Sequence, residues 1–246
     1  VKPTVTKAGN LATIEYKPAT ALASKSAHTV SLGYLDAGGK PATLDWSFEV
    51  AEYKGPVKDL VKGYEAIILG SANLTADKGG FSGKAGDYAI DFGRGSGQSV
   101  LISDASFLNA ATAADQLTFA LWVKKYDTAN NSAFWADSPS SSSGMRGFQA
   151  HTPWSDNSIY FDTAGCCDGS TQRISAGIDT YANYTGDVSW WTNAWHHFAF
   201  TKNAAHKQVW IDGNLFLEGD NTNPLPTDFA RIWLGAEGGG PNAGTA

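Results

Sequence analysis

The chain has 246 residues, of which 42% are hydrophobic and 17% charged, and its formal net charge at pH 7 is −6. This length allows a small domain followed by a larger one. The negative charge argues against nucleic acid and anionic membrane surfaces as partners. Since no run of about 18 apolar residues occurs, we expect no membrane insertion. The shortage of thiols and basic residues favours a secreted or cell-surface protein.

The first fifty residues alternate between apolar and polar side chains in several short stretches. In "HTVSLGYLD" and "LDWSFEV" every second residue is apolar, and the turn-forming sequence "DAGGKP" lies between them. Period-two alternation around such a turn predicts an antiparallel hairpin. Another short strand is predicted through Ile14 and Tyr16. Since a sandwich of two sheets needs about seven strands, residues 1–52 are predicted to be the C-terminal part of a module whose beginning is missing.

Residues 53–62 are predicted to be a linker, because they contain a Gly-Pro pair that breaks regular structure. Residues 63–246 form the second predicted domain, in which the alternation returns in "DYAIDFG", "LTFALWVKK", "SIYFDT", "AWHHFAFTK", "KQVWIDG" and "RIWLGA". The segment "DASFLNAATAAD" has room for one helical turn, and "SPSSSSG" is predicted to be a flexible loop. The predicted fold class is therefore all-β.

Three of these stretches occur in the order of a known family. "FALWVK", "WHHFAFT" and "VWIDG" resemble motifs of the laminin-G-like, concanavalin A-like jelly-roll domains of bacterial surface and secreted proteins. The resemblance covers residues 61–240 and implies an antiparallel jelly-roll β-sandwich. Residues 1–52 resemble the last strands of a bacterial immunoglobulin-like module. Neighbouring domains of a longer polypeptide are thus expected partners.

The family ends in a further strand after its last glycine-rich turn. This chain stops at "GGGPNAGTA" without a matching stretch, so the final strand is predicted to be missing. An unpaired sheet edge favours association. We therefore expect the isolated chain to self-associate more than a longer one.

Enzyme motifs are missing from the sequence. Related glycoside hydrolases carry E-x-D-x-x-E on one strand, which puts two catalytic carboxylates on one face, and no such triplet occurs here. Neither a G-x-S-x-G elbow, a P-loop nor an H-E-x-x-H pair is present. The prediction is that the chain is not an enzyme.

Two adjacent histidines and several tryptophans are further candidates for site residues. His196 and His197 are adjacent in a predicted strand, so they point to opposite faces; His197 is expected to pack inside the sheet and His196 to face elsewhere. Trp190 and Trp191 lie in a polar segment and either bind a sugar or cover the core. A packing role in a core or on a sheet face is expected for Trp46, Trp122, Trp195 and Trp210.

The segment 146–173 resembles a pattern found in a subset of these domains. Its predicted ligand-binding residues are His151, Trp154, Asp156, Asp162, Cys166, Cys167 and Arg173. A tryptophan ring stacks on the C–H face of a sugar while polar groups bond the hydroxyls. The resemblance implies a carbohydrate or glycoconjugate as the ligand.

Cys166 and Cys167 are the only cysteines and are adjacent. A zinc site needs three or four ligands, and a redox pair is usually C-x-x-C. We favour a disulfide between the two, although adjacent Cα atoms lie ~3.8 Å apart, below the usual ~4.4–6.8 Å. Two free thiols in a glycine-rich turn remain the alternative.

The predicted function is a non-catalytic binding module that serves adhesion or substrate targeting. One alternative is a structural spacer within a large surface protein, and a less favoured one is a glycoside hydrolase. Domains of this family often hold a structural calcium ion (Ca²⁺) at the rim of the sandwich. Candidate ligands are Asp91, Asp156, Asp162 and Asp168, but their spacing singles out none of them.

Overall fold

The computed structural model describes residues 3–9, 11–16, 18, 22–23, 25–50, 53–93, 97–127 and 132–235. The chain divides into two compact units, Val1–Tyr53 and Lys54–Ala246. Among the described residues, no helix has both the length and the apolar character needed to cross a membrane. The stretch "GGGPNAGTA", to which the expectation of a missing final strand refers, lies outside these ranges.

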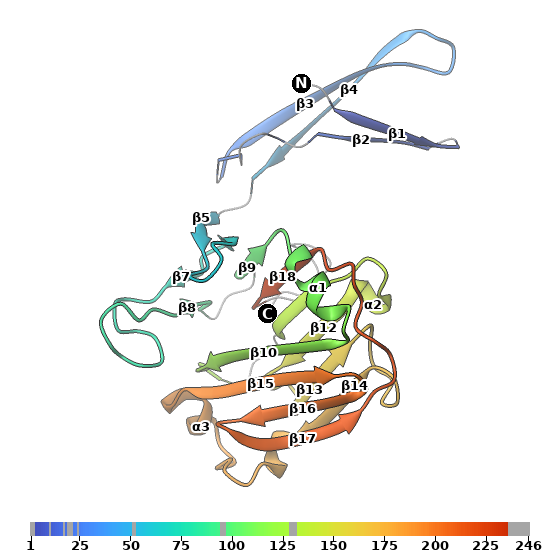
Figure 1. Ribbon diagram of the computed structural model, residues 1–246. Coiled ribbons are helices and arrows are strands. Elements are labelled where there is room, and N and C mark those ends of the chain that lie inside the picture. Colours follow the sequence, from blue (N-terminus) through green and yellow to red (C-terminus); the bar gives the residue numbers. More distant parts are fainter. Residues whose placement is uncertain are drawn as a thin grey trace. The chain divides into compact units, whose positions relative to one another are not determined.

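The first unit contains two antiparallel hairpins (Figure 1). β1 (Thr4–Ala8) pairs with β2 (Leu11–Glu15), and β3 (Ala27–Leu35) pairs with β4 (Pro41–Glu49). The turn between β3 and β4 is closed by Asp36, whose Oδ1 accepts the backbone N–H groups of Gly38 and Lys40 at 2.8 and 2.9 Å. The predicted hairpin is confirmed, while the immunoglobulin-like assignment stays a prediction.

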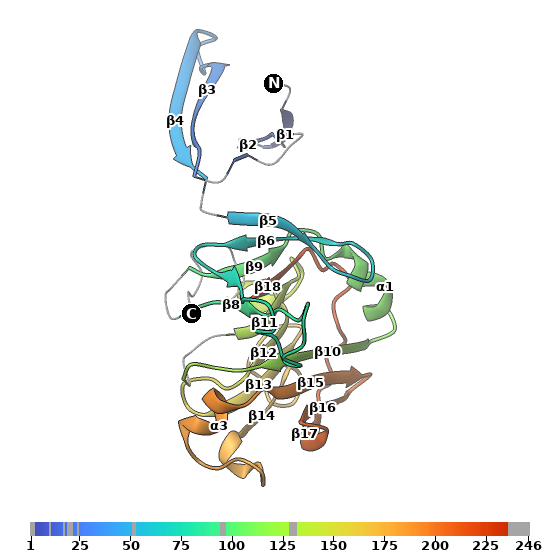
Figure 2. The ribbon, with the colours of Figure 1, turned by 90° about the vertical axis from the view of Figure 1, so that its left-hand side faces the viewer.

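The second unit is a sandwich of two antiparallel sheets (Figures 1 and 2). The larger sheet has eight strands in the order β14-β13-β12-β11-β18-β9-β6-β5. These are β5 (Tyr53–Lys58), β6 (Glu65–Leu69), β9 (Ser99–Ile102), β11 (Ser132–Asp137), β12 (Arg146–His151), β13 (Ser158–Thr163), β14 (Arg173–Gly177) and β18 (Arg231–Leu234). The predicted all-β sandwich is confirmed.

The smaller sheet has four strands in the order β10-β15-β16-β17. They are β10 (Gln116–Val123), β15 (His196–Asn203), β16 (His206–Ile211) and β17 (Asn214–Asp220). A separate two-stranded ladder joins β7 (Asn73–Leu74) to β8 (Ile90–Asp91). The helices are short: η1 (Ser106–Leu108), α1 (Asn109–Thr112), α2 (Ser142–Met145), η2 (Ile178–Thr180) and α3 (Val188–Asn193). η1 and α1 occupy the segment where one helical turn was predicted.

The core lies between the two large sheets. Alternate residues of each strand point inward, and the inward set is aromatic: Phe148 and Phe161 from the large sheet, Phe198 and Phe200 from the small one, all buried. Burying each such side chain contributes about 1.5–3 kcal/mol. The residues that alternate with them point away from this core, so they are not needed for packing between the two sheets.

Trp190 and Trp191 lie in α3, and both are buried in this core. The sequence left two roles open for these tryptophans, sugar binding or covering the core, and the structure supports the second. Asp187 starts this helix by accepting the backbone N–H of Ser189 at 2.7 Å, which is a common N-terminal cap.

The sequence predicted that His197 packs inside the sheet and that His196 faces elsewhere, and this prediction is wrong. They do point to opposite faces, but His196 is the buried one, since the inward phase of β15 is set by Phe198 and Phe200. Its Nδ1 lies 2.7 Å from Asp212 Oδ2 and its Nε2 lies 2.8 Å from the backbone oxygen of Trp190. The half-buried His197 faces outward.

Two predicted loops also have more structure than expected. Within the predicted linker 53–62, residues Tyr53–Lys58 form β5, at the edge of the large sheet. An edge strand accommodates Pro56, which has no N–H to donate to a ladder. The serine-rich run 138–144 is tied to Asp228, whose carboxylate accepts the N–H and Oγ–H of Ser140 at 2.8 and 2.9 Å.

Candidate ligand-binding site

The outward face of the large sheet carries an unusual row of polar and aromatic side chains. Because Phe148 and Ala150 of β12 point into the core, the alternate residues Gln149 and His151 point away from it. In the strand register, Gln149 stands beside Asp162 of β13, which stands beside Arg173 of β14. Three of the seven predicted site residues, His151, Asp162 and Arg173, therefore lie on one face, over β12 to β14.

Asp162 is the centre of this row. Its side chain is 0% exposed, and its two oxygens accept Nε and Nη2 of Arg173 at 2.6 and 2.7 Å. Nη1 of Arg146 adds a third bond at 3.1 Å. Such charge-assisted, two-pronged bonds are the strong kind. Asp162 was predicted to meet the ligand, but it is enclosed by the two arginines, so its role is to hold them in place.

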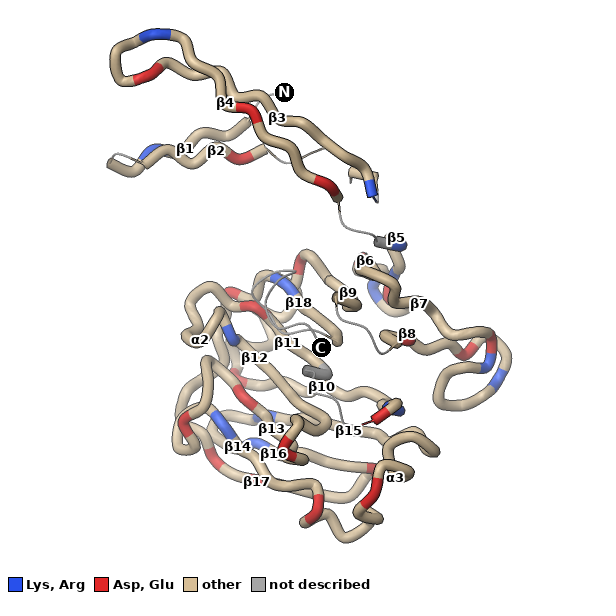
Figure 3. The backbone as a smooth tube through the Cα atoms, turned by 180° about the vertical axis from the view of Figure 1, so that it is seen from behind, with Lys and Arg blue, Asp and Glu red and all other residues tan. Residues whose placement is uncertain are grey.

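The arginines remain partly accessible, with 19% of the Arg173 side chain and 15% of the Arg146 side chain exposed. Burial by itself lowers the pKa of Arg173, but the hydrogen bonds and charge of Asp162 outweigh it and raise that pKa above its ordinary value. Figure 3 shows basic and acidic positions side by side on β12 to β14. This part of the face therefore presents guanidinium donors without a large excess of charge.

A chain of rings runs from Arg173 to Trp154. The guanidinium of Arg173 lies 4.3 Å from the ring centre of Tyr160, a cation–π distance. The rings of Tyr160 and Trp154 are 5.7 and 4.5 Å from that of His151. The Tyr160 hydroxyl donates to Asp156 at 2.6 Å, which lowers the pKa of Asp156 and raises that of Tyr160.

Trp154 is presented by the hairpin that joins β12 to β13. Its N–H donates to the oxygen of Ser158 at 2.8 Å, and its own oxygen accepts from Asn157 at 3.0 Å. Asn157 has φ +61°, a left-handed conformation that asparagine tolerates better than most residues. Trp154 is half-buried and Asp156 exposed, so both reach the edge of the face.

Cys166 and Cys167 are joined by a disulfide, as predicted. Nη2 of Arg173 lies 3.3 Å from Cys166 Sγ, so the disulfide borders the arginines. Gly165 has φ +115°, and a Cβ there would lie 2.5 Å from the Gln172 side chain. Glycine is thus needed at that turn, and Cys167 is left exposed.

Lys207 anchors this loop from the core side, and sequence reasoning missed it. Its fully buried ammonium donates to the backbone oxygens of Phe161 and Gln172 at 2.8 and 2.9 Å and to Asn221 Oδ1 at 2.9 Å. Burial lowers the pKa of Lys207 to about 7, although the charge of Asp162 acts to raise it. The lysine links β16 to β13 and to the end of the disulfide loop.

Sequence reasoning also left Tyr160, Arg146 and two residues of β11 out of the site. Trp135 lies beneath the guanidinium of Arg146, at 4.8 Å. Its Nε1–H donates to the buried carboxylate of Asp137 at 2.7 Å. The alternation in "SAFWAD" and "SIYFDT" could have placed Trp135, Asp137 and Tyr160 on the outward face.

The four aspartates considered for calcium do not form one site. Asp91 accepts the Tyr126 hydroxyl at 2.8 Å, and Asp168 accepts Ser170 N–H at 2.8 Å, while Asp156 and Asp162 have the partners given above. Over the described ranges, no three His, Cys, Asp or Glu side chains are grouped so that they could hold a metal ion. Calcium binding stays a prediction.

Comparison with known proteins identifies the family. Residues 94–245 match the Laminin_G_3 family of the concanavalin A-like lectin/glucanases superfamily. The chain belongs to this superfamily. The resemblance read from the laminin-G-like motifs is thereby confirmed. No curated protein sequence matches this laminin-G-like chain.

Several solved structures are similar to this laminin-G-like chain at low identity. The binding domain of botulinum neurotoxin DC in complex with SialylT is 14% identical, with TM-score 0.47, over 71% of this chain and 40% of that chain. Domains LG4-5 of the mouse laminin alpha1 chain are 13% identical, with TM-score 0.35, over 49% and 28%. This chain thus spans less than half the length of either.

Proposed function

We propose that the chain is a non-catalytic module that binds carbohydrate or glycoconjugate through the outward face of β12 to β14. The observation that carries the proposal is the chain of contacts that joins Trp154, through the buried His151, to Tyr160, Arg173 and the disulfide. Trp154 and Tyr160 offer rings for the C–H faces of a sugar. Arg173 and the exposed Asp156 supply hydrogen-bond donors and acceptors for its hydroxyls.

The roles within this site differ with burial. Trp154, Tyr160, Asp156 and Cys167 are accessible enough to touch a ligand. His151 and Asp162 are buried, so they position the neighbouring rings and guanidinium groups. Rigid support of this kind lowers the entropy lost on binding.

The carboxylates of this face favour binding over hydrolysis. Glycosidases need one carboxyl group as acid and a second as nucleophile or base. Asp162 is fully enclosed by arginines, and the pKa of Asp156 is lowered by the Tyr160 hydroxyl and so favours the ionised form. Neither residue is suited to donate a proton to a leaving group.

Adhesion or substrate targeting by a secreted or cell-surface bacterial protein is the setting that we propose. Membership of the laminin-G-like family supports a location outside the cell. In that setting the module would hold its parent protein against a glycan-bearing surface.

A glycan array tests the proposal with the full chain, Trp154→Ala and the matched control Trp46→Ala. Trp46 is an exposed tryptophan of the first unit, so its loss changes the same side chain away from the site. We expect wild type and the control to bind the same glycans and Trp154→Ala to lose about tenfold or more in affinity. An array with no binding would favour the structural spacer.

A further inference from the structure

The outward face of the small sheet carries a second set of residues suited to a ligand. In the register of β10 and β15, its outward pairs are Gln116 with Asn203, Thr118 with Thr201, Ala120 with Ala199, and Trp122 with His197. These positions alternate with core residues such as Phe119 and Phe198. The face thus has neutral polar side chains at one end, alanines in the middle and aromatic rings at the other end.

The aromatic end is an exposed wall of two stacked rings. Phe81, from the segment between β7 and β8, stacks on Trp122 with ring centres 3.4 Å apart and planes within 12°. Even so, Phe81 is 48% exposed and Trp122 is 41% exposed. Figure 2 shows that segment passing the end of β10. Both stacked rings therefore remain accessible from solvent.

The segment that carries Phe81 is held in shape by Asp87. Its Oδ2 accepts Ser82 N–H and Oγ–H at 2.5 and 2.6 Å. These bonds lower the pKa of Asp87. Phe81 therefore directly precedes a turn that is closed by these two hydrogen bonds.

A second indole borders the middle of the face. Ala199 pairs with Trp210 of the next strand, β16, and Trp210 is half-buried. Because alanine side chains are short, Ala120 and Ala199 form a low floor between Trp122 and Trp210. Such a floor between aromatic walls admits a flat, ring-shaped ligand to the sheet.

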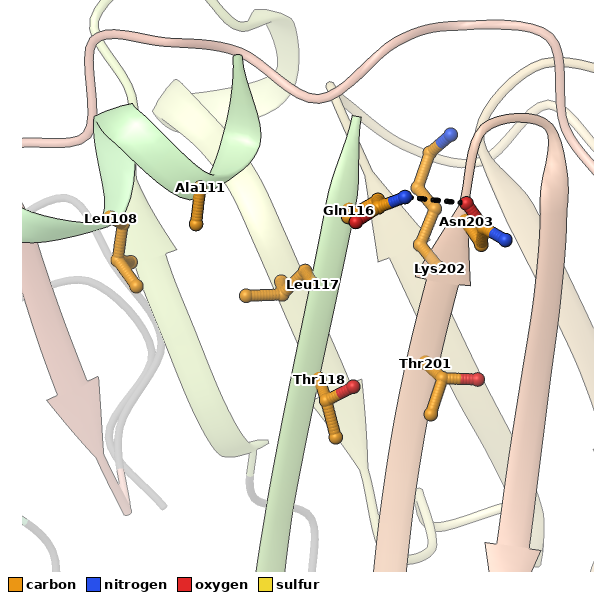
Figure 4. A pocket seen from close by; sticks show the side chains of 8 residues that line it. All are labelled: Leu108, Ala111, Gln116, Leu117, Thr118, Thr201, Lys202 and Asn203. Atoms are coloured by element: carbon orange, nitrogen blue, oxygen red, sulfur yellow. Dashed lines mark hydrogen bonds between the residues drawn. The ribbon is translucent and has the colours of Figure 1, made fainter. Parts of the chain in front are cut away.

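The polar end opens into a hollow of about 470 Å³ between α1 and the ends of β10 and β15 (Figure 4). Gln116 Nε2–H donates to Asn203 Oδ1 at 3.0 Å, and the Thr118 and Thr201 hydroxyls lie nearby on the same strands. The ammonium of Lys202 is bonded to Asp115 at 3.1 Å, so the charge of this lysine is already compensated. The hollow thus offers amides and hydroxyls on one side and the apolar side chains of Leu108, Ala111 and Leu117 on the other.

We infer that this face is a second carbohydrate-binding surface, which takes a neutral polysaccharide chain along β10 and β15. The six residue steps from Gln116 to Trp122 span about 20 Å, room for several sugar rings. Aromatic faces beside neutral amides and hydroxyls match the apolar and polar sides of an uncharged sugar. The inference goes beyond the proposed site, because this surface belongs to the other sheet.

Affinity electrophoresis of the full chain tests the inference. Native gels contain xyloglucan, galactomannan or laminarin as neutral probes, or polygalacturonate as an anionic one. The variants are Trp122→Ala, Phe81→Ala, Trp154→Ala, the double variant Trp122→Ala with Trp154→Ala, and the control Trp46→Ala. We expect a neutral probe to retard the wild type, and Trp122→Ala and Phe81→Ala each to weaken that retardation about tenfold. Near-UV circular dichroism checks that each variant is folded.

The outcomes separate the two surfaces. If Trp154→Ala alone abolishes retardation, the site on β12 to β14 stands and the second surface is refuted. If only Trp122→Ala and Phe81→Ala reduce it, the second surface stands and the first site does not bind these neutral probes, while the glycan array still tests the first site separately. If Trp122→Ala and Trp154→Ala each weaken retardation and the double variant loses the sum of the two effects, both surfaces bind the probe.

Other results would overturn the inference directly. These are no retardation by any neutral probe, retardation by polygalacturonate alone, or retardation that survives both Trp122→Ala and Phe81→Ala. Light scattering after size-exclusion chromatography measures the oligomeric state and gives one more result that would overturn the inference. An oligomer that Trp122→Ala converts to a monomer would make this face an interface between copies of the chain.

Discussion

Replacing Asp162 by asparagine should destabilise the second unit strongly. The carboxylate is fully buried and makes three hydrogen bonds to two arginines that are themselves 15% and 19% exposed. The amide keeps the shape but removes the charge, which leaves Arg146 and Arg173 without their counter-ion. Breaking a buried ion pair costs about 3–5 kcal/mol, and the partial exposure of the arginines puts this case near the lower end, about 3 kcal/mol.

Differential scanning calorimetry of the full chain measures the effect. For a unit of this size, about 3 kcal/mol corresponds to a fall in Tm of roughly 6–12 °C. Asp156→Asn is the matched control, because Asp156 is exposed; its cost should stay below about 1 kcal/mol. If Asp162→Asn shifts the transition no more than Asp156→Asn does, the proposed role of Asp162 is wrong.

Three further predictions concern Lys207, the cysteines and catalysis. Burial puts the pKa of Lys207 near 7 against an ordinary 10.5, so the unfolded chain binds more protons between these values and stability should rise with pH there. Urea unfolding at several pH values should show this rise in the wild type and a smaller one in Lys207→Met; equal slopes would contradict the assignment. Alkylation followed by intact-mass measurement should modify no cysteine before reduction and both after it, and modification of either without reductant would contradict the disulfide. No polysaccharide in a broad panel should release products, and a release that Asp156→Asn abolishes would show that the chain is an enzyme.

The strands could be predicted because their alternation is local. In β10, the inward Leu117, Phe119 and Leu121 and the outward Trp122 follow the predicted pattern. The phase of β15 was harder to predict, because both histidines lie at the start of this strand and its inward face is fixed by packing against the other sheet. Tertiary packing, not the local pattern, buries His196.

The candidate site was only partly predictable for the same reason. The aromatic and polar residues of segment 146–173 are close in sequence, so their grouping could be anticipated. The burial of Asp162 could not, since it depends on arginines from two neighbouring strands. Lys207 was hidden too, because its oxygen partners Gln172 and Phe161 are 35 and 46 residues away.

The central claim is that the face over β12 to β14 binds carbohydrate through Trp154. Isothermal titration calorimetry tests it with the full chain and the glycan that binds best on the array. The account predicts that Trp154→Ala raises the Kd about tenfold or more while Trp46→Ala leaves it unchanged. An equal Kd for wild type and Trp154→Ala would contradict it.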